Sequence, residues 1–92
     1  MLQFWVYILK CSDGSYYTGH TDNIEARLVA HNLGIYPGYT SKRLPVKLVF
    51  VENCPSRDEA FVAERKIKGW SRKKKQVLIE QGWEAMQGIW KT

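Results

Sequence analysis

The chain has 92 residues, of which 45% are hydrophobic and 25% are charged, and its formal net charge is +5. This length allows one domain with a modest core and excludes separate catalytic and substrate-recognition domains. Because there is no low-complexity tract and no internal repeat, the composition indicates an ordered domain rather than a disordered tail or a repeat protein.

The sequence has no feature that directs it to a membrane or an oxidising compartment. Cys11 and Cys54 fit no metal-ligand spacing, and the N-terminus does not resemble a signal peptide. No apolar run approaches the length of a membrane span. We therefore expect a cytoplasmic protein with free thiols and no membrane partner.

The first predicted element is a strand over residues 2–10, LQFWVYILK, whose almost wholly apolar side chains are typical of a strand buried on both faces. We therefore expect this strand to be the central strand of a sheet. SDGS and then SYYTG follow, which predicts a β-hairpin with Gly14 at positive φ.

The length of the hairpin loop decides where the tyrosines lie. A two-residue turn would leave Tyr7 and Tyr17 on opposite faces of the sheet. A three-residue loop would pair Tyr7 with Gly19, place both tyrosines on one face and leave space beside the Tyr7 ring. The residue types do not choose between these registers, because Asp-Gly serves either turn.

The first predicted helix begins at Asp22, with Glu25 as its capping-box partner, and runs to about Leu33 before Gly34. On a helical projection Arg27 and His31 lie together, so that they can act on one target. A separate arc of the helix is apolar and consists of Ala26, Val29, Ala30 and Leu33.

The loop IYPGYTSKRLP, which includes Pro37, mixes aromatic and basic side chains. Tyr39, Lys42 and Arg43 are candidates for nucleic-acid contact, although ordinary loop packing explains such residues nearly as well. A second mostly apolar strand, VKLVFVE, follows at residues 46–52.

The next helix has a well-marked start, with Ser56 as its cap and Glu59 closing the capping box, and it ends at Gly69. Its apolar arc contains one carboxylate, Glu64, among Ala60, Phe61, Ala63 and Ile67. A carboxylate facing the core is costly unless it is paired, protonated or bound to metal. Taken alone, Glu64 favours a buried ion pair over a metal ligand.

Seven of the fourteen basic residues lie between Arg65 and Lys75, where Ser71 is the predicted cap of a third helix. The cluster favours a polyanionic partner, although basic helical faces are often only solvated. The nucleic-acid-binding candidates in it are Arg65, Lys66, Lys68, Arg72, Lys73, Lys74 and Lys75.

The tail carries Trp83, Met86, Ile89 and Trp90 at helical spacing. A role in the core or in self-association suits these side chains better than a ligand site. We expect one domain over residues 1–83, a tail over residues 84–92, and a monomer or weak homodimer.

Taken together, these elements resemble the GIY-YIG nuclease superfamily. The first motif stands here as WVY at residues 5–7, the second as YTG at residues 17–19, and the helix pattern as NIEARLVAH, while Glu64 in FVAERKIKGW matches the metal-binding glutamate. The resemblance covers nearly the whole chain and is closest to small stand-alone bacterial members of an uncharacterised family. The ordered set is far more specific than any single motif.

The sequence departs from the superfamily pattern at Trp5, Val6 and Thr18, which are mostly backbone-packing positions. The asparagine that some members use after the glutamate does not follow Glu64. Loss of a tyrosine would disturb the chemistry more than these departures do.

The resemblance implies an α+β fold in which helices flank a three-stranded antiparallel sheet, with both tyrosines in one site. That requirement selects the three-residue hairpin loop. It also implies a metal-dependent DNA endonuclease, structure-selective and acting in repair or recombination, with one divalent ion, Mg²⁺ or Mn²⁺, on Glu64.

The same resemblance suggests roles for the candidate catalytic residues, which are Tyr7, Tyr17, Arg27, His31 and Glu64. Tyr7 is the candidate general base, and Arg27 is expected to clamp the phosphate. His31 would take the proton from Tyr7 or bind the phosphate, and Tyr17 would orient the water or the phosphate. The alternative is a non-catalytic nucleic-acid-binding module that uses the basic cluster for sequence-independent contacts.

Overall fold

The computed structural model describes residues 3–36 and 38–90, with side chains described for all of these except 87–90. Leu2 of the predicted strand, Pro37 of the predicted loop and the side chains of Ile89 and Trp90 therefore lie outside the described part. The elements are β1 (Phe4–Lys10), β2 (Tyr16–Thr21), α1 (Ile24–Asn32), the 3₁₀ helix η1 (Thr40–Lys42), β3 (Lys47–Cys54), α2 (Arg57–Lys68), α3 (Arg72–Gln81) and α4 (Trp83–Trp90).

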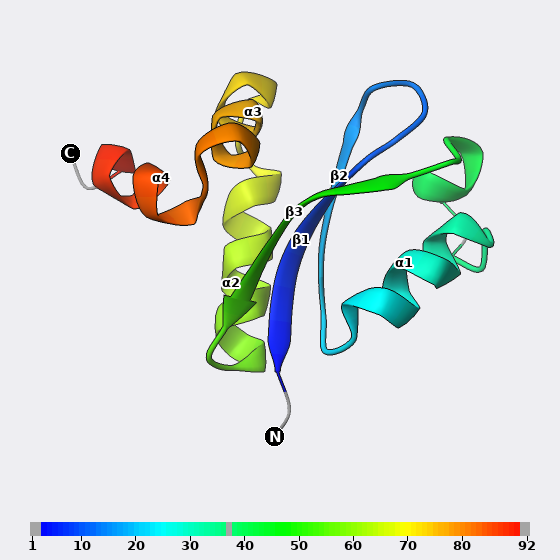
Figure 1. The fold of residues 1–92 in the computed structure, drawn as a ribbon, viewed down its shortest axis with the longest axis horizontal. Helices are drawn as coiled ribbons and strands as arrows, with labels where there is room; N and C mark the ends of the chain where they lie inside the picture. The colour runs from blue at the N-terminus through cyan, green and yellow to red at the C-terminus, as the bar shows by residue number, and fades with distance from the viewer. Residues whose placement is uncertain (1–2, 37, 91–92) are drawn as a thin grey trace.

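The three strands form one antiparallel sheet in the order β2-β1-β3, so that β1 is central (Figure 1). Four consecutive β1 residues, Val6 to Leu9, are buried because both faces of this strand are covered. The prediction of an α+β fold with helices around a three-stranded antiparallel sheet is confirmed.

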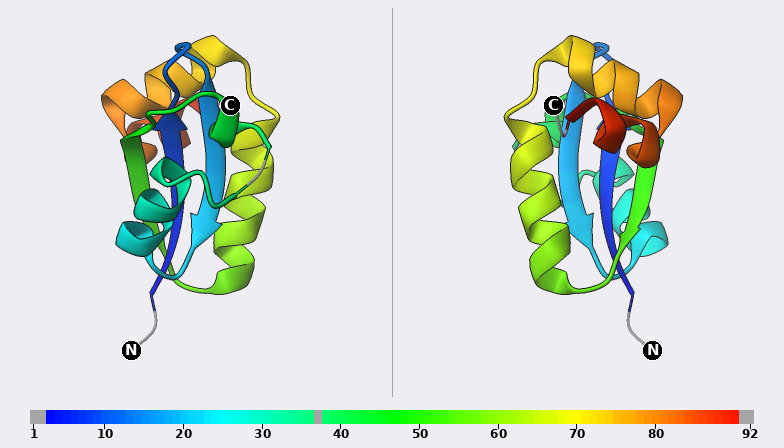
Figure 2. Two further views of the ribbon diagram at one scale, coloured as in Figure 1. Left: turned by 90° about the vertical axis from the view of Figure 1, so that its right-hand side faces the viewer. Right: turned by 90° about the vertical axis from the view of Figure 1, so that its left-hand side faces the viewer.

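Each face of the sheet has its own core. Val6 and Ile8 pack with buried side chains of α2, α3 and α4 on one face. Tyr7 and Leu9 pack on the other face with Ile24 and Leu28 of α1 and with the chain around Val46. Figure 2 shows α2 alongside β2 and α1 on the opposite side of the sheet. The alternation of β1 therefore assigns each of its side chains to one of the two cores.

The hairpin has the three-residue loop. Tyr7 lies opposite Gly19, and Leu9 lies opposite Tyr17. The Cys11 amide donates to the Ser15 carbonyl at 2.8 Å, and Gly14 has a φ of 85°. Both tyrosines therefore share the α1 face of the sheet, as the resemblance requires.

Gly19 is needed because the Tyr7 ring lies against its backbone. A Cβ atom at Gly19 would lie 2.5 Å from the Tyr7 hydroxyl oxygen and 2.6 Å from the ring carbon that carries it. Since Tyr7 is only 1% exposed, its ring cannot swing into solvent to make room.

The cap of α1 is Asn23, and the prediction that Asp22 is the cap is wrong. The Asn23 backbone is extended, and its side chain accepts from the Ala26 amide at 3.1 Å. Asp22 instead forms an ion pair with Arg57 at the start of α2, 3.6 Å from its guanidinium. Because the Asp22 carboxylate is used in this ion pair, the side chain of the next residue, Asn23, caps the helix instead.

The predicted apolar arc of α1 faces solvent. Val29 is 58% exposed and Leu33 is 69% exposed, whereas Ile24 and Leu28 pack on the sheet and His31 is buried. The arc of Ile24, Leu28 and His31 faces inward in its place. Its aliphatic side chains are larger than Ala26 and Ala30 of the outer arc, and His31 has hydrogen-bond partners inside the protein.

Helix α2 faces inward largely as predicted, with Ala60, Ala63, Glu64 and Ile67 buried. Phe61 is an exception, since it is 45% exposed and its ring lies edge-on to His20 rather than in the core. The predicted caps of α2 and α3 are confirmed, because Ser56 accepts from the Glu59 amide and Ser71 accepts from the Lys74 amide.

The predicted tail forms most of α4. Its Met86 is 2% exposed and packs in the core that includes Leu78. Cys11 and Cys54 are both buried free thiols. Within residues 3–36 and 38–90, no helix is long and apolar enough to cross a membrane.

Candidate active site

A buried pair of side chains joins β1 to α1. The Tyr7 hydroxyl oxygen lies 3.1 Å from His31 Nε2, and the other ring nitrogen, Nδ1, lies 2.9 Å from Thr40 Oγ1. All three residues are nearly inaccessible, at 1% for Tyr7, 2% for His31 and 3% for Thr40. Each nitrogen of the imidazole therefore has one hydroxyl partner, which holds the ring in place.

Burial dominates the protonation of this pair. It raises the pKa of Tyr7 above the ordinary value of 10.0, with Tyr17 adding to the rise and Arg27 opposing it. Burial also lowers the pKa of His31 below 6.5, and Arg27 lowers that pKa further. At neutral pH the proton consequently stays on the Tyr7 oxygen and the imidazole is uncharged.

Three further side chains surround the imidazole. The Tyr17 ring lies edge-on at 5.1 Å from the His31 ring, and the Tyr36 ring lies at 5.0 Å. The Arg27 guanidinium lies 5.0 Å from the centre of the Tyr36 ring. Arg27 is one helical turn from His31, so α1 supplies both the charge and the imidazole of this group.

Glu64 is buried and paired on both of its oxygens. Oε1 lies 2.7 Å from His20 Nδ1, and Oε2 lies 3.1 Å from Lys68 Nζ. His20 belongs to β2, whereas Lys68 is one turn further along α2. The ion pair that the position of Glu64 predicted is therefore present, with a histidine and a lysine as its partners.

The two groups meet at the edge of β2. Tyr17 and Gly19 lie on the side of the sheet that α1 covers. His20 pairs with Val6 and lies on the other side, where α2 packs. Lys68 links the two sides, because its Nζ lies 5.8 Å from the centre of the Tyr17 ring and also contacts Glu64. Figure 2 shows α2 running beside this strand edge. All five predicted catalytic residues therefore gather around one strand, from β1, β2, α1 and α2.

The donors available for a divalent ion are few. Among the described residues no three His, Cys, Asp or Glu side chains gather into a ligand set. Glu64, with 11% of its side chain exposed, is the carboxylate at this edge, and His20 lies beside it. Such a site fits an ion that takes one protein carboxylate and completes its shell with water and phosphate oxygens, as Mg²⁺ does.

The predicted nucleic-acid-binding loop contains one residue beside the site and one with a structural partner. The Tyr39 ring, in a residue that is 43% exposed, stacks on Tyr17 at 6.4 Å. Arg43 stacks on Tyr39 and donates to Asp13 Oδ2 at 3.0 Å, so its guanidinium ties the loop to the hairpin. Lys42 is exposed.

The basic cluster divides between two sides of the molecule. Burial lowers the pKa of Lys75, and the nearby charge of Lys68 lowers it further. Arg72 stacks on Tyr16 of β2 at 4.5 Å. These side chains lie along the β2 side of the sheet, where the catalytic candidates are.

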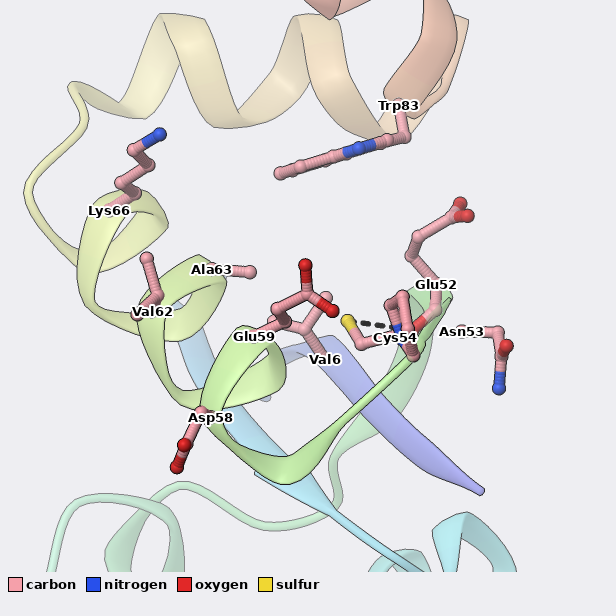
Figure 3. A pocket seen from close by; sticks show the side chains of 11 residues that line it. Val6, Glu52, Asn53, Cys54, Asp58, Glu59, Val62, Ala63, Lys66 and Trp83 are labelled. Carbon is pink, nitrogen blue, oxygen red and sulfur yellow. Dashed lines mark hydrogen bonds between the residues drawn. The ribbon is translucent and has the colours of Figure 1, made fainter. Parts of the chain in front are cut away.

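The other members of the cluster have different neighbours. Lys66 lines a groove of about 410 Å³ together with Cys54, Glu59 and Trp83, none of which is a catalytic candidate (Figure 3). Lys74 approaches the Trp70 ring at 4.6 Å and Arg65 approaches the Phe61 ring at 5.7 Å, whereas Lys73 is exposed. The cluster is therefore not a single continuous face.

Sequence reasoning missed two residues of the site, His20 and Thr40. A signal for His20 existed, because strand alternation places the residue after Gly19 on the face that an inward Glu64 also approaches. Thr40 had no comparable signal, since a hydroxyl in a long loop has no periodicity that predicts its partner.

Known proteins are similar to this chain in sequence and in fold. Residues 3–76 match the model of the GIY-YIG catalytic domain. A UPF0213 protein of Staphylococcus haemolyticus is 47% identical over 81 residues, which cover 88% of this chain and 99% of that protein. One from Haloquadratum walsbyi is 45% identical over 83 residues, covering 90% of this chain and 93% of the other.

Two solution NMR structures are similar to this fold. The UPF0213 protein of Bacillus halodurans is 40% identical, with a TM-score of 0.56, and the match covers 86% of this chain and 84% of that one. A protein of E. faecalis is 37% identical, with a TM-score of 0.60 and coverage of 87% and 85%. The matched domain is a nuclease domain, which implies a nucleic-acid substrate, and nucleases with it generally depend on a divalent metal. With its register, its inward glutamate and a match over residues 3–76, this chain belongs to the GIY-YIG family.

Proposed function

We propose that this protein is a metal-dependent DNA endonuclease, structure-selective and acting in repair or recombination in the cytoplasm. The observation that carries the proposal is the buried contact of the Tyr7 hydroxyl with His31 Nε2 at 3.1 Å, at the strand edge where Glu64 also lies. Binding alone needs neither a buried tyrosine–histidine pair nor an inward carboxylate.

In this proposal Tyr7 and His31 move a proton together. With the ring proton on Nδ1, His31 donates to Thr40 and accepts from the Tyr7 hydroxyl. Because burial raises the pKa of Tyr7, a free tyrosinate is costly, and the oxygen passes its proton to Nε2 as it takes one from the attacking water. The Thr40 hydroxyl can accept the Nδ1 proton in the tautomer that this transfer requires, and its contact holds the ring in place.

Arg27 and Tyr17 act on the phosphate. The guanidinium of Arg27 is held near the imidazole by Tyr36, and its fork of donors suits two phosphate oxygens. The Tyr17 hydroxyl orients the phosphate or the water from the same face. Preorganised charge of this kind commonly supplies a large part of the rate enhancement.

Glu64 would hold one divalent ion, Mg²⁺ or Mn²⁺, and the bound ion would neutralise charge on the phosphate. The single carboxylate supports weak binding of the ion without substrate. His20 keeps the carboxylate oriented toward the strand edge through its 2.7 Å contact.

DNA with unpaired segments is the substrate that the surroundings support. Tyr36 and Tyr39 are 38% and 43% exposed beside the site and offer ring faces on which bases can stack. Lys68 and Lys75 add positive charge for backbone phosphates. The buried free thiols of Cys11 and Cys54 support a reducing compartment such as the cytoplasm.

The test is cleavage of nicked, flapped and branched DNA, and of matching RNA, with Mg²⁺ or Mn²⁺. We expect Tyr7→Phe and Glu64→Gln each to lower the cleavage rate by about 100-fold or more. Glu80→Gln, a charge-matched change at an exposed residue of α3, is expected to cleave like the wild type. Equal cleavage by all of these proteins would contradict the proposal.

A non-catalytic nucleic-acid-binding module is the second candidate function. The observation that favours it is that both oxygens of Glu64 are already paired, with His20 and Lys68. This candidate predicts DNA binding that Tyr7→Phe and Glu64→Gln leave unchanged, together with no cleavage by the wild type under any metal condition. Sedimentation in the same buffers would show whether the protein is the expected monomer or weak homodimer.

A further inference from the structure

Lys68 occupies the oxygen of Glu64 that is not bound by His20. Its Nζ lies 3.1 Å from Oε2, and 48% of the lysine side chain is exposed against 11% of the glutamate side chain. A Glu–Lys pair four residues apart on a helix is a common surface feature. Here it differs, because the carboxylate is buried and is the candidate metal ligand.

An ammonium group and a divalent cation cannot share this carboxylate without strong repulsion. His20 and Lys68 each contact one oxygen of the carboxylate, and lone pairs that could bind an ion remain on both oxygens. Charges of the same sign a few ångströms apart, partly screened from water, repel more than they would in bulk solvent. The Lys68 ammonium therefore weakens the binding of an ion to Glu64 for as long as it stays beside the carboxylate.

Lys68 is the partner that can move. Its side chain is flexible and about half exposed, whereas only 26% of the His20 side chain is exposed and its ring packs against Phe61 at 5.6 Å. Lys68 also lies 5.8 Å from the Tyr17 ring, on the side of the strand edge where the phosphate would bind. A small swing would carry its charge from the carboxylate to that phosphate.

We propose that Lys68 competes with the divalent ion for Glu64 and is drawn away by a substrate phosphate, so that metal and nucleic acid bind cooperatively. The inference rests on the proposed function, since it takes Glu64 as the metal ligand. By linkage, nucleic acid then tightens metal binding by the same factor by which metal tightens nucleic-acid binding. Without nucleic acid, the lysine keeps the site in a state of low metal affinity.

The first experiment measures Mn²⁺ affinity in the absence of nucleic acid, from the EPR signal of the free ion. Lys68→Met is expected to bind Mn²⁺ about 3- to 10-fold more tightly than the wild type, because the competing charge is gone. Lys68→Arg keeps the charge and is expected to bind Mn²⁺ as weakly as the wild type.

Lys66→Met is the matched control, because it removes the same charge from α2 at a residue that lines the groove near Trp83 (Figure 3). Its Mn²⁺ affinity should stay within about 2-fold of the wild type. An unchanged or weaker affinity in Lys68→Met, or an equal gain in Lys66→Met, would overturn the proposal.

The second experiment repeats the titration with a branched oligonucleotide whose phosphorothioate linkages resist cleavage. The wild type should bind Mn²⁺ several-fold more tightly with the oligonucleotide, and this gain should shrink in Lys68→Met. A full gain in the variant would overturn the coupling role of Lys68.

These outcomes separate the inference from the proposed function. Cleavage by the wild type with no change of Mn²⁺ affinity in Lys68→Met would support the nuclease function and contradict the competition between Lys68 and the ion. Tighter Mn²⁺ binding by Lys68→Met without cleavage by any of the proteins would support the competition and contradict the nuclease function.

Discussion

Helices α1 and α2 both contribute to the candidate site, but they meet the sheet in opposite ways. In α2 the apolar arc faces inward and carries one carboxylate, Glu64, into the core. In α1 the arc of Val29 and Leu33 faces solvent, and the arc that carries His31 is buried. Hydrophobic periodicity therefore identifies the buried face only when no second arc offers larger aliphatic side chains and partnered polar groups.

The difference follows from the two faces of β1. The face under α2 presents Val6 and Ile8, which only an apolar surface can cover. The face under α1 presents Tyr7, whose hydroxyl needs a partner when it is buried, and His31 provides one. A helix that covers a polar atom must bring a polar side chain inward.

The strongest test of the α1 side replaces His31. His31→Gln should lower the cleavage rate by about 100-fold or more, because glutamine cannot take the Tyr7 proton. It should also lower the free energy of unfolding by about 1–3 kcal/mol, because Tyr7 and Thr40 lose well-placed partners. Steady-state kinetics and urea denaturation measure the two effects. Cleavage near the wild-type rate would mean that α1 contributes packing alone.

The next test acts on the strand between the two helices. Gly19→Ala should lower the free energy of unfolding by about 1–3 kcal/mol, because the new methyl group overlaps the Tyr7 hydroxyl. It should also reduce cleavage, since Tyr7 can move only by separating from His31. Gly69→Ala is the control, because a Cβ there meets nothing closer than 3.5 Å. Equal unfolding free energies for the two variants would contradict the close packing of Tyr7 on β2.

The pH dependence of stability tests the neutral state of His31. Its pKa in the folded protein is held below 6.5 by burial and by Arg27, so below pH 6.5 the unfolded chain binds a proton that the folded protein binds less readily. Stability is therefore fully present above pH 6.5 and falls as the pH drops, by at most about 1.4 kcal/mol per pH unit for one proton.

Urea denaturation of wild type and His31→Gln between pH 7.5 and about pH 5 isolates this contribution, because all other titrating groups are common to both proteins. The wild type should lose more stability over this range than the variant does. Parallel curves would mean that His31 is protonated as easily in the folded protein as in the unfolded chain.

The smallest effect is expected on the outer arc of α1. Val29→Ser and Leu33→Ser should each change the free energy of unfolding by less than about 0.5 kcal/mol, since both side chains are more than half exposed. Cleavage should be unchanged. In α2, by contrast, Ile67→Ser at a fully buried position should be strongly destabilising. A large loss from Leu33→Ser would show that the outer arc is covered in solution.

Much of the fold could be predicted from local patterns. The apolar run of β1, the Asp-Gly turn and the Ser56 and Ser71 caps act over a few residues, and a few residues are enough to predict them. The facing of α1 could not be predicted, because it depends on which face of β1 the helix covers. The same holds for Phe61, whose exposure depends on the neighbouring ring of His20.

The sequence by itself determined the order of the elements and the inward position of Glu64, since these follow from spacing along one chain, and through the family resemblance it supplied the five catalytic candidates. Only the tertiary structure decided the partners. The contacts of His20 with Glu64 and of Thr40 with His31 join residues 44 and 9 positions apart, across elements whose register no local pattern specifies. The residue types of the turn left the hairpin register open, and the family resemblance selected the three-residue loop. The tertiary structure has this register, in which Tyr7 packs against Gly19.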